Sequence, residues 1–138
     1  MCSTSRNRMA LTLELAEKLI AKAKAKSKEM DVIMSIAVVD DGGHLVAFER
    51  MDGGRWHTTM LAIGKAYTSA GFRTTTDELQ KRFKDRQGFV TSFVGQGKFV
   101  FIEGGVPILE NDKVIGAIGV SGGTGPQDKE CADAVLNT

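Results

Sequence analysis

Cysteine is scarce in this sequence, which has two, Cys2 and Cys131, near opposite ends of the chain. They form no Cys-x-x-Cys or Cys-x-x-Cys-His pattern, which argues against a zinc ribbon, a thioredoxin-type motif and covalent attachment of a c-type haem. We therefore expect two free thiols in a reducing compartment.

An excess of one charge sign and long apolar runs are lacking as well. The 18 Lys and Arg residues stand against 17 Asp and Glu, a net charge of +1, whereas nucleic-acid binding usually requires a strong basic excess. No apolar run approaches the ~20 residues of a membrane span. The N-terminus also lacks the apolar core of a signal peptide. We expect a cytoplasmic protein that binds neither nucleic acid nor a membrane.

Length and apolar content fit one domain. A chain of this size removes roughly 65–70% of its unfolded surface from water on folding. Because 42% of its 138 residues are apolar, it can form a core without disulfides or a structural metal. We expect a flexible N-terminal segment at 1–11 and a single domain at 12–138.

Apolar residues at helical spacing, preceded by capping residues, predict the helices. Thr12 is a suitable N-cap, and both Thr75 with Glu78 and Thr124 with Gln127 match a capping box. The predicted helices are 12–30, 56–72, 75–84, a short helix within 86–98, and 126–136.

Short β-branched segments separated by turn residues predict the strands. The segment 32–39 is an almost unbroken apolar run, which is typical of a central strand covered on both faces. The predicted strands are 32–39, 44–51, 98–103, 106–110 and 113–120. Hairpin turns join several of them, so the expected fold class is α/β (α+β). It would have one five-stranded, largely antiparallel sheet with helices packed on it.

The helix predicted at 56–72 is rich in small residues, including Gly64 near its centre. Glycine costs a helix about 1 kcal/mol relative to alanine, so either a neighbouring backbone or a flat ligand should approach closely there. His57 shares a face with Met60, Leu61 and Gly64. A histidine with a thioether nearby, above such a groove, would suit a haem edge or an axial ligand.

The glycine-rich stretch 116–125 fails the tests for a nucleotide-binding loop. A P-loop needs a lysine directly after its glycines, and the nearest one is Lys129, inside the predicted last helix. Ser121 formally completes a Gly-x-Ser-x-Gly pattern, but an antiparallel sheet is the wrong context for a nucleophile elbow. A strand-to-helix turn is favoured over a weak anion site at the helix N-terminus.

Arg50, Asp52, Lys65 and Glu103 are candidate polar groups around a pocket. Two of them, Arg50 and Lys65, join His44 and His57 as the four polar residues that are candidates for ligand binding. His44 and His57 could ligate iron or act as a base near neutral pH, although either could also be an exposed or hydrogen-bonded histidine. Arg50 and Lys65 could pair with propionate or phosphate groups, or form salt bridges within the chain. Two histidines without suitably spaced carboxylates do not predict a structural metal site.

Five strings follow one another in the sequence: Ser35-Ile-Ala-Val-Val-Asp-Asp-Gly-Gly-His-Leu-Val-Ala, Arg50-Met-Asp52, Lys65-Ala-Tyr-Thr-Ser-Ala70, Gly104-Gly-Val-Pro-Ile108 and Gly116-Ala-Ile-Gly-Val-Ser-Gly-Gly123. Together they resemble the GlcG/HbpS family, which includes the C-terminal domain of PduO-type proteins. The resemblance implies a profilin-like fold, homo-oligomers, and association of some members with haem or related tetrapyrroles. Gly104 and Gly105, from one of these strings, join the four polar residues as candidate cofactor-binding residues.

The leading hypothesis is an oligomeric accessory protein that binds haem, or alternatively cobalamin, in an operon for the use of small alcohols or organic acids. One alternative is an enzyme acting on a small organic acid or aldehyde, with Arg50 and Lys65 binding the anionic group and His57 as the base. Another is a structural scaffold without a cofactor, whose glycines serve packing and subunit contacts.

Overall fold

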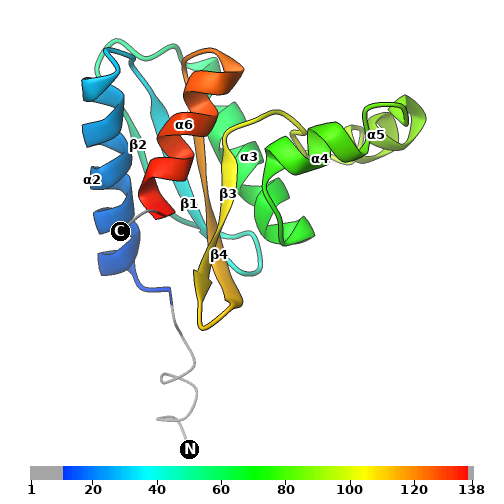
Figure 1. Ribbon diagram of the computed structural model, residues 1–138, viewed down its shortest axis with the longest axis horizontal. Helices are drawn as coiled ribbons and strands as arrows, with labels where there is room; N and C mark the ends of the chain where they lie inside the picture. The colour runs from blue at the N-terminus through cyan, green and yellow to red at the C-terminus, as the bar shows by residue number, and fades with distance from the viewer. Residues whose placement is uncertain (1–10, 137–138) are drawn as a thin grey trace, which may run out of the picture.

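The computed structural model describes residues 11–136, which form a four-stranded antiparallel sheet with helices on both faces (Figure 1). The strand order is β2-β1-β4-β3, with β1 at Ser35–Asp40, β2 at Leu45–Arg50, β3 at Gly105–Glu110 and β4 at Lys113–Ser121. The helices are α2 (Leu13–Glu29), α3 (His57–Phe72), α4 (Thr76–Arg82), α5 (Gln87–Val94) and α6 (Gly125–Leu136). Of the predicted N-terminal segment 1–11, residues 1–10 lie outside the described residues, and Leu11 is buried in the core.

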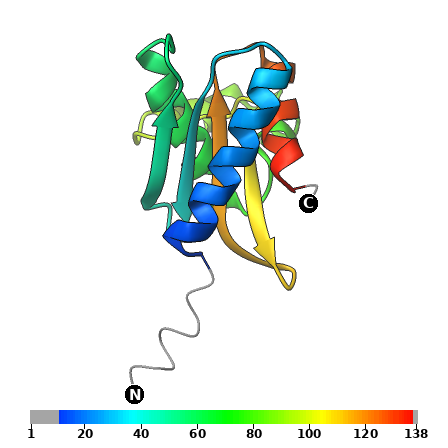
Figure 2. The ribbon, with the colours of Figure 1, turned by 90° about the vertical axis from the view of Figure 1, so that its left-hand side faces the viewer.

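Each face of the sheet has its own core. Ile36 and Val38 of β1 pack with α2 and α6, whereas Ala37 and Val39 pack with α3. Figure 2 shows α2 lying across the first of these faces, with α6 beside it. Burial on both sides explains why this strand is apolar without alternation, and the prediction of a central strand is confirmed.

Small side chains let α3 approach the opposite face of the sheet closely. Ala62, Ala66 and Ala70 of α3 are all buried against it. A side chain on Gly119 of β4 would collide with the carbonyl oxygen of Ala62. The glycine in the strand and the alanines in the helix therefore pack against one another within a single protomer.

Gly64 faces a neighbouring segment of backbone. A Cβ at this position would lie 2.8 Å from the carbonyl oxygen of Lys98 and 2.5 Å from Cγ2 of Val100. The predicted close approach of a neighbouring backbone at Gly64 is therefore confirmed. The alternative prediction, a flat ligand above Gly64, is wrong because Val100 occupies that space.

The predicted fifth strand at 98–103 is also wrong, since this segment pairs with no strand of the described sheet. It runs along α3 instead, where the backbone N–H of Val100 donates to the hydroxyl of Thr68 over 2.8 Å. Phe99 and Phe101 alternate as they would in a strand, but their rings join an aromatic cluster shared with α4 and α5. The other phenylalanines of that cluster are Phe72, Phe83, Phe89 and Phe93.

The predicted helix starts are confirmed by their capping bonds. The hydroxyls of Thr12 and Thr75 each accept from the backbone N–H three residues further on, over 3.1 Å. At α6, the N–H of Thr124 donates to Gln127 Oε1 while the N–H of Gln127 donates to the Thr124 hydroxyl, a complete capping box. None of the helices within 11–136 is long and apolar enough to cross a membrane.

Candidate functional site

A pocket of about 230 Å³ lies between the N-terminal half of α3 and the turn that joins β4 to α6. We call it the α3 pocket. Its polar side chains come from two sides of the fold. They are Arg55, His57, Thr58 and Lys65 on the α3 side, and Ser121 and Asp128 on the β4–α6 side.

Helix α3 brings two of the predicted residues to this pocket. His57 and Lys65 are eight residues apart, and at about 3.6 residues per turn they lie on one face of the helix, two turns from each other. His57 is exposed at the start of α3, whereas Lys65 is only 2% exposed. The pocket therefore has an accessible imidazole at its mouth and a buried ammonium group at its floor.

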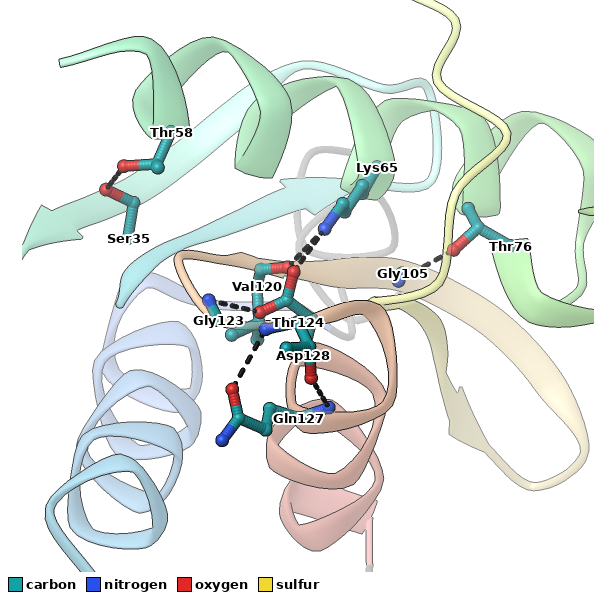
Figure 3. Close-up of polar contacts among 10 residues, drawn as sticks. All are labelled: Ser35, Thr58, Lys65, Thr76, Gly105, Val120, Gly123, Thr124, Gln127 and Asp128. Carbon is teal, nitrogen blue, oxygen red and sulfur yellow. Dashed lines mark hydrogen bonds and ion pairs between the residues drawn. The ribbon is translucent and has the colours of Figure 1, made fainter. Parts of the chain in front are cut away.

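The floor of the pocket is a buried ion pair between Lys65 and Asp128 (Figure 3). Lys65 Nζ donates to Asp128 Oδ2 over 2.8 Å and to the carbonyl oxygen of Val120 over 2.9 Å. The N–H of Gly123 donates to Asp128 Oδ1 over 2.8 Å. Burial raises the pKa of the Asp128 carboxyl, and the Lys65 charge counteracts part of that rise. The pair ties α3 to β4 and α6 at the base of the pocket.

Gly104 and Gly105, predicted to contact a cofactor, lie against Lys65. A Cβ at Gly104 would stand 3.0 Å from Lys65 Nζ, and one at Gly105 would collide with the Lys65 carbonyl oxygen. Gly104 also has a φ of +124°, which disfavours residues with a side chain. The two glycines make room for the lysine and for the helix that carries it.

Ser121 ends β4 with its side chain on the α3 side of the sheet. It is the direct cross-strand partner of Ser35, and directly paired residues in an antiparallel ladder share a face. The Ser35 hydroxyl lies 2.8 Å from the Thr58 hydroxyl of α3, which fixes that face. Ser121 is 3% exposed, yet its hydroxyl makes no hydrogen bond within the described part of the chain.

Exposed apolar side chains stand at the start of α3, next to His57 in the sequence, and on the lining of the pocket. Trp56 is 72% exposed and Met60 67%, and the Trp56 ring meets the His57 ring edge-on at 6.2 Å. Ile102, 46% exposed, lines the same pocket. Large apolar side chains concentrated near one imidazole are typical of a surface that a ligand or partner covers.

Comparison with known proteins identifies the family of this fold. The model of the family described as haem-degrading protein HbpS-like matches residues 11–137. The chain belongs to the HbpS-like family. It is 35% identical to Protein GlcG of Escherichia coli K12 over 116 residues, 84% of either chain. The resemblance seen in the sequence is therefore confirmed.

Solved structures extend the likeness of this HbpS-like chain to its fold. The crystal structure of ORFY from Klebsiella pneumoniae superposes with a TM-score of 0.85 at 30% identity, covering 92% of this chain and 88% of that one. The crystal structure of a PduOC–haem complex superposes with a TM-score of 0.83 at 27% identity, covering 92% and 93% of the two chains. Both likenesses span nearly the whole domain.

The remaining polar residues of the HbpS-like chain that were predicted to bind a ligand, His44 and Arg50, do not line the α3 pocket. His44 follows the β1–β2 turn, where its Nδ1 lies 3.3 Å from Asp40 Oδ1. The adjacent Gly43 packs on Tyr67 of α3. Tyr67 follows His57 by ten residues, so the two lie about 15 Å apart along the helix axis. The two histidines therefore stand near opposite ends of α3 and do not surround one site.

Arg50 ends β2 and its side chain lies against Gly54. It is not among the residues that line the α3 pocket. The arginine that lines this pocket is Arg55. Arg55 and Asp128 were not predicted, because their sequence context carries no motif and Asp128 is 63 residues from its partner Lys65.

Proposed function

We propose that this HbpS-like protein is an oligomeric, cytoplasmic accessory protein that binds haem or a related tetrapyrrole and serves an operon for the use of small alcohols or organic acids. The observation that carries the proposal is the exposed imidazole of His57 at the start of α3, with the exposed side chains of Trp56 and Met60 at the same end of the helix. The similarity to the haem complex of PduOC supports a tetrapyrrole over other flat ligands.

The residues around His57 fit such a group chemically. The imidazole has no hydrogen-bond or ion-pair partner within the described residues, so a nitrogen is free for a metal. Trp56 and Met60 offer apolar, polarisable surface for a macrocycle, and Arg55 offers a charge for a propionate group. Bound haem would supply an iron that accepts an imidazole nitrogen and can change its oxidation state.

The size of the pocket determines where the tetrapyrrole would lie. At about 230 Å³, the pocket is smaller than the ~300–1,000 Å³ typical of sites that enclose a drug-sized ligand. The macrocycle would therefore lie across the mouth, against Trp56 and Met60, and not within the pocket. In the proposed homo-oligomer, a second copy of the chain would cover its outer side.

Titration with hemin, followed by absorbance, tests this proposal. We expect a shifted Soret band that saturates near one hemin per protomer or per pair of protomers. His57→Ala should alter the band and weaken binding at least about tenfold, because ligation by the imidazole is lost. His44→Ala is the matched control, since it removes an imidazole remote from the pocket, and should leave the titration unchanged.

Two further measurements complete the test. A parallel titration with cobalamin distinguishes haem from corrinoid, and native mass spectrometry of the protein with and without hemin reports the number of subunits. Hemin binding with equal affinity and spectrum in the wild type and His57→Ala would contradict the proposed site, and the absence of any Soret shift would contradict haem binding itself.

A second candidate function, catalysis on a small organic acid or aldehyde, is favoured by the position of His57 and Lys65 on one pocket. His57 would then remove a proton next to a carbonyl group. Exchange of the methyl protons of pyruvate in deuterated water, followed by NMR, would measure this step. No acceleration by the wild type over His57→Gln would exclude it for this substrate.

A further inference from the structure

The α3 pocket is lined by a hydroxyl that forms no hydrogen bond with the described part of the chain. Ser121 is 3% exposed and lines the pocket, but no group in the described part of the chain bonds to its hydroxyl. No fully buried side-chain nitrogen or oxygen of the described residues lacks a hydrogen-bond partner, so this unbonded hydroxyl must reach the open space of the pocket. Its position on the α3 side of the sheet directs it to the pocket, where water or a bound ligand can form a hydrogen bond with it.

Two cationic groups accompany this hydroxyl with donor capacity left over. The Lys65 ammonium has three N–H donors, and it uses one on Val120 and one on Asp128. The Arg55 guanidinium forms no ion pair or hydrogen bond with the described residues. One donor thus remains at the floor, and the whole guanidinium group remains at the rim.

The charges that face the pocket favour an anion. Arg55 and Lys65 are two cations, and Asp128 is the one carboxylate among the lining residues. Both oxygens of Asp128 are already occupied, by Lys65 and by the N–H of Gly123. Glu103 lines the neighbouring groove with Lys26 and Lys129. Its carboxylate also lies against Gly125, which lines the α3 pocket, and it opposes the two cations in part.

We infer that the α3 pocket is a carboxylate-binding site, with Arg55 pairing with the carboxylate group and with the Ser121 hydroxyl and the free N–H of Lys65 binding an oxygen on the adjacent carbon. A carboxylate next to a hydroxyl or carbonyl oxygen is the arrangement of a short 2-hydroxy or 2-oxo acid. The pocket volume of about 230 Å³ favours such a small free acid over a larger ligand. The site does not depend on the proposed haem binding.

Titration calorimetry with lactate and pyruvate tests the site in the full-length protein. Lactamide, which has the same shape without the charge, is the ligand control. Arg55→Gln should weaken lactate binding at least about tenfold, as expected for a lost charge-assisted pair, and Ser121→Ala about threefold to tenfold. Arg82→Gln and Ser92→Ala make the same chemical changes on α4 and α5, and both should bind lactate as the wild type does. Both pocket variants should keep the wild-type circular dichroism spectrum.

A carboxylate group could also come from a propionate arm of a tetrapyrrole, and a second arm of the experiment distinguishes this source. Hemin dimethyl ester lacks the free carboxylates of hemin. If Arg55→Gln weakens the binding of hemin but not the binding of the dimethyl ester, a propionate group of hemin occupies the same site. Lactate binding without any hemin binding would support the carboxylate-binding site and contradict the proposed haem-binding function. The inference is overturned if neither lactate, pyruvate nor the hemin propionates depend on Arg55 and Ser121, or if lactamide binds as tightly as lactate.

Discussion

Replacing Lys65 by methionine should destabilise the fold by about 3 kcal/mol, because the Asp128 carboxylate would remain buried without its cation. The two side chains are 2% and 5% exposed, and their charged atoms lie 2.8 Å apart. Removing one partner of such a buried pair costs about 3–5 kcal/mol. The lower end applies here because the Gly123 N–H stays bonded to Asp128 and methionine fills most of the lysine's volume.

The loss of stability in Lys65→Met should also depend on pH. Burial already raises the pKa of Asp128, and loss of the Lys65 charge raises that pKa further. A carboxyl with a higher pKa in the folded state stabilises the fold below its unfolded pKa, and this contribution is lost as pH rises through the folded pKa. Lys65→Met should therefore be more harmful at about pH 8 than at about pH 5.

Urea unfolding followed by circular dichroism measures these free energies. Lys129→Met is the matched control, because the Lys129–Asp133 pair has the same length of 2.8 Å but both side chains are 41% exposed. Its loss should stay below about 1 kcal/mol. Equal losses in the two variants, or a loss in Lys65→Met that adding Asp128→Asn does not reduce, would refute the reasoning that an uncompensated buried charge sets the cost.

Three other predictions concern two glycines and the buried cysteine. Gly119→Ala should cost more than about 2 kcal/mol, since its methyl group would collide with the Ala62 carbonyl oxygen. Gly71→Ala, whose methyl group would meet nothing within 4 Å, should stabilise α3 by about 0.5–1 kcal/mol. Thermal unfolding of both variants would check these two predictions. Melting temperatures that change in the same direction and by similar amounts would contradict them. Burial raises the pKa of the Cys131 thiol to about 12, so in a Cys2→Ser background it should resist a thiol reagent at about pH 8 until the protein unfolds. Rapid labelling of the native protein would contradict that burial.

Much of the fold could be predicted because its signals are local. The capping residues Thr12, Thr75 and Thr124 stand within three residues of the groups they bond. The exception is the segment 98–103, where the alternation of Phe99 and Phe101 matched a strand. Those rings pack with α4 and α5, and sequence alternation does not distinguish that partner from a sheet.

The site was less predictable because its contacts join distant parts of the chain. His57 and Lys65 share a helix, so their spacing placed them on one face. The bond from Lys65 to Asp128 spans 63 residues, and no spacing rule connects them. Ser121 stood out in the sequence as part of an accidental motif, and its position beside Ser35 in the sheet is what directs it to the pocket.

A crystal structure of the hemin complex would show whether haem binds at His57. We expect iron bonded to an imidazole nitrogen of His57, with the macrocycle against Trp56 and Met60. Iron bound at His44, or a macrocycle that leaves Trp56 and Met60 uncovered, would contradict it.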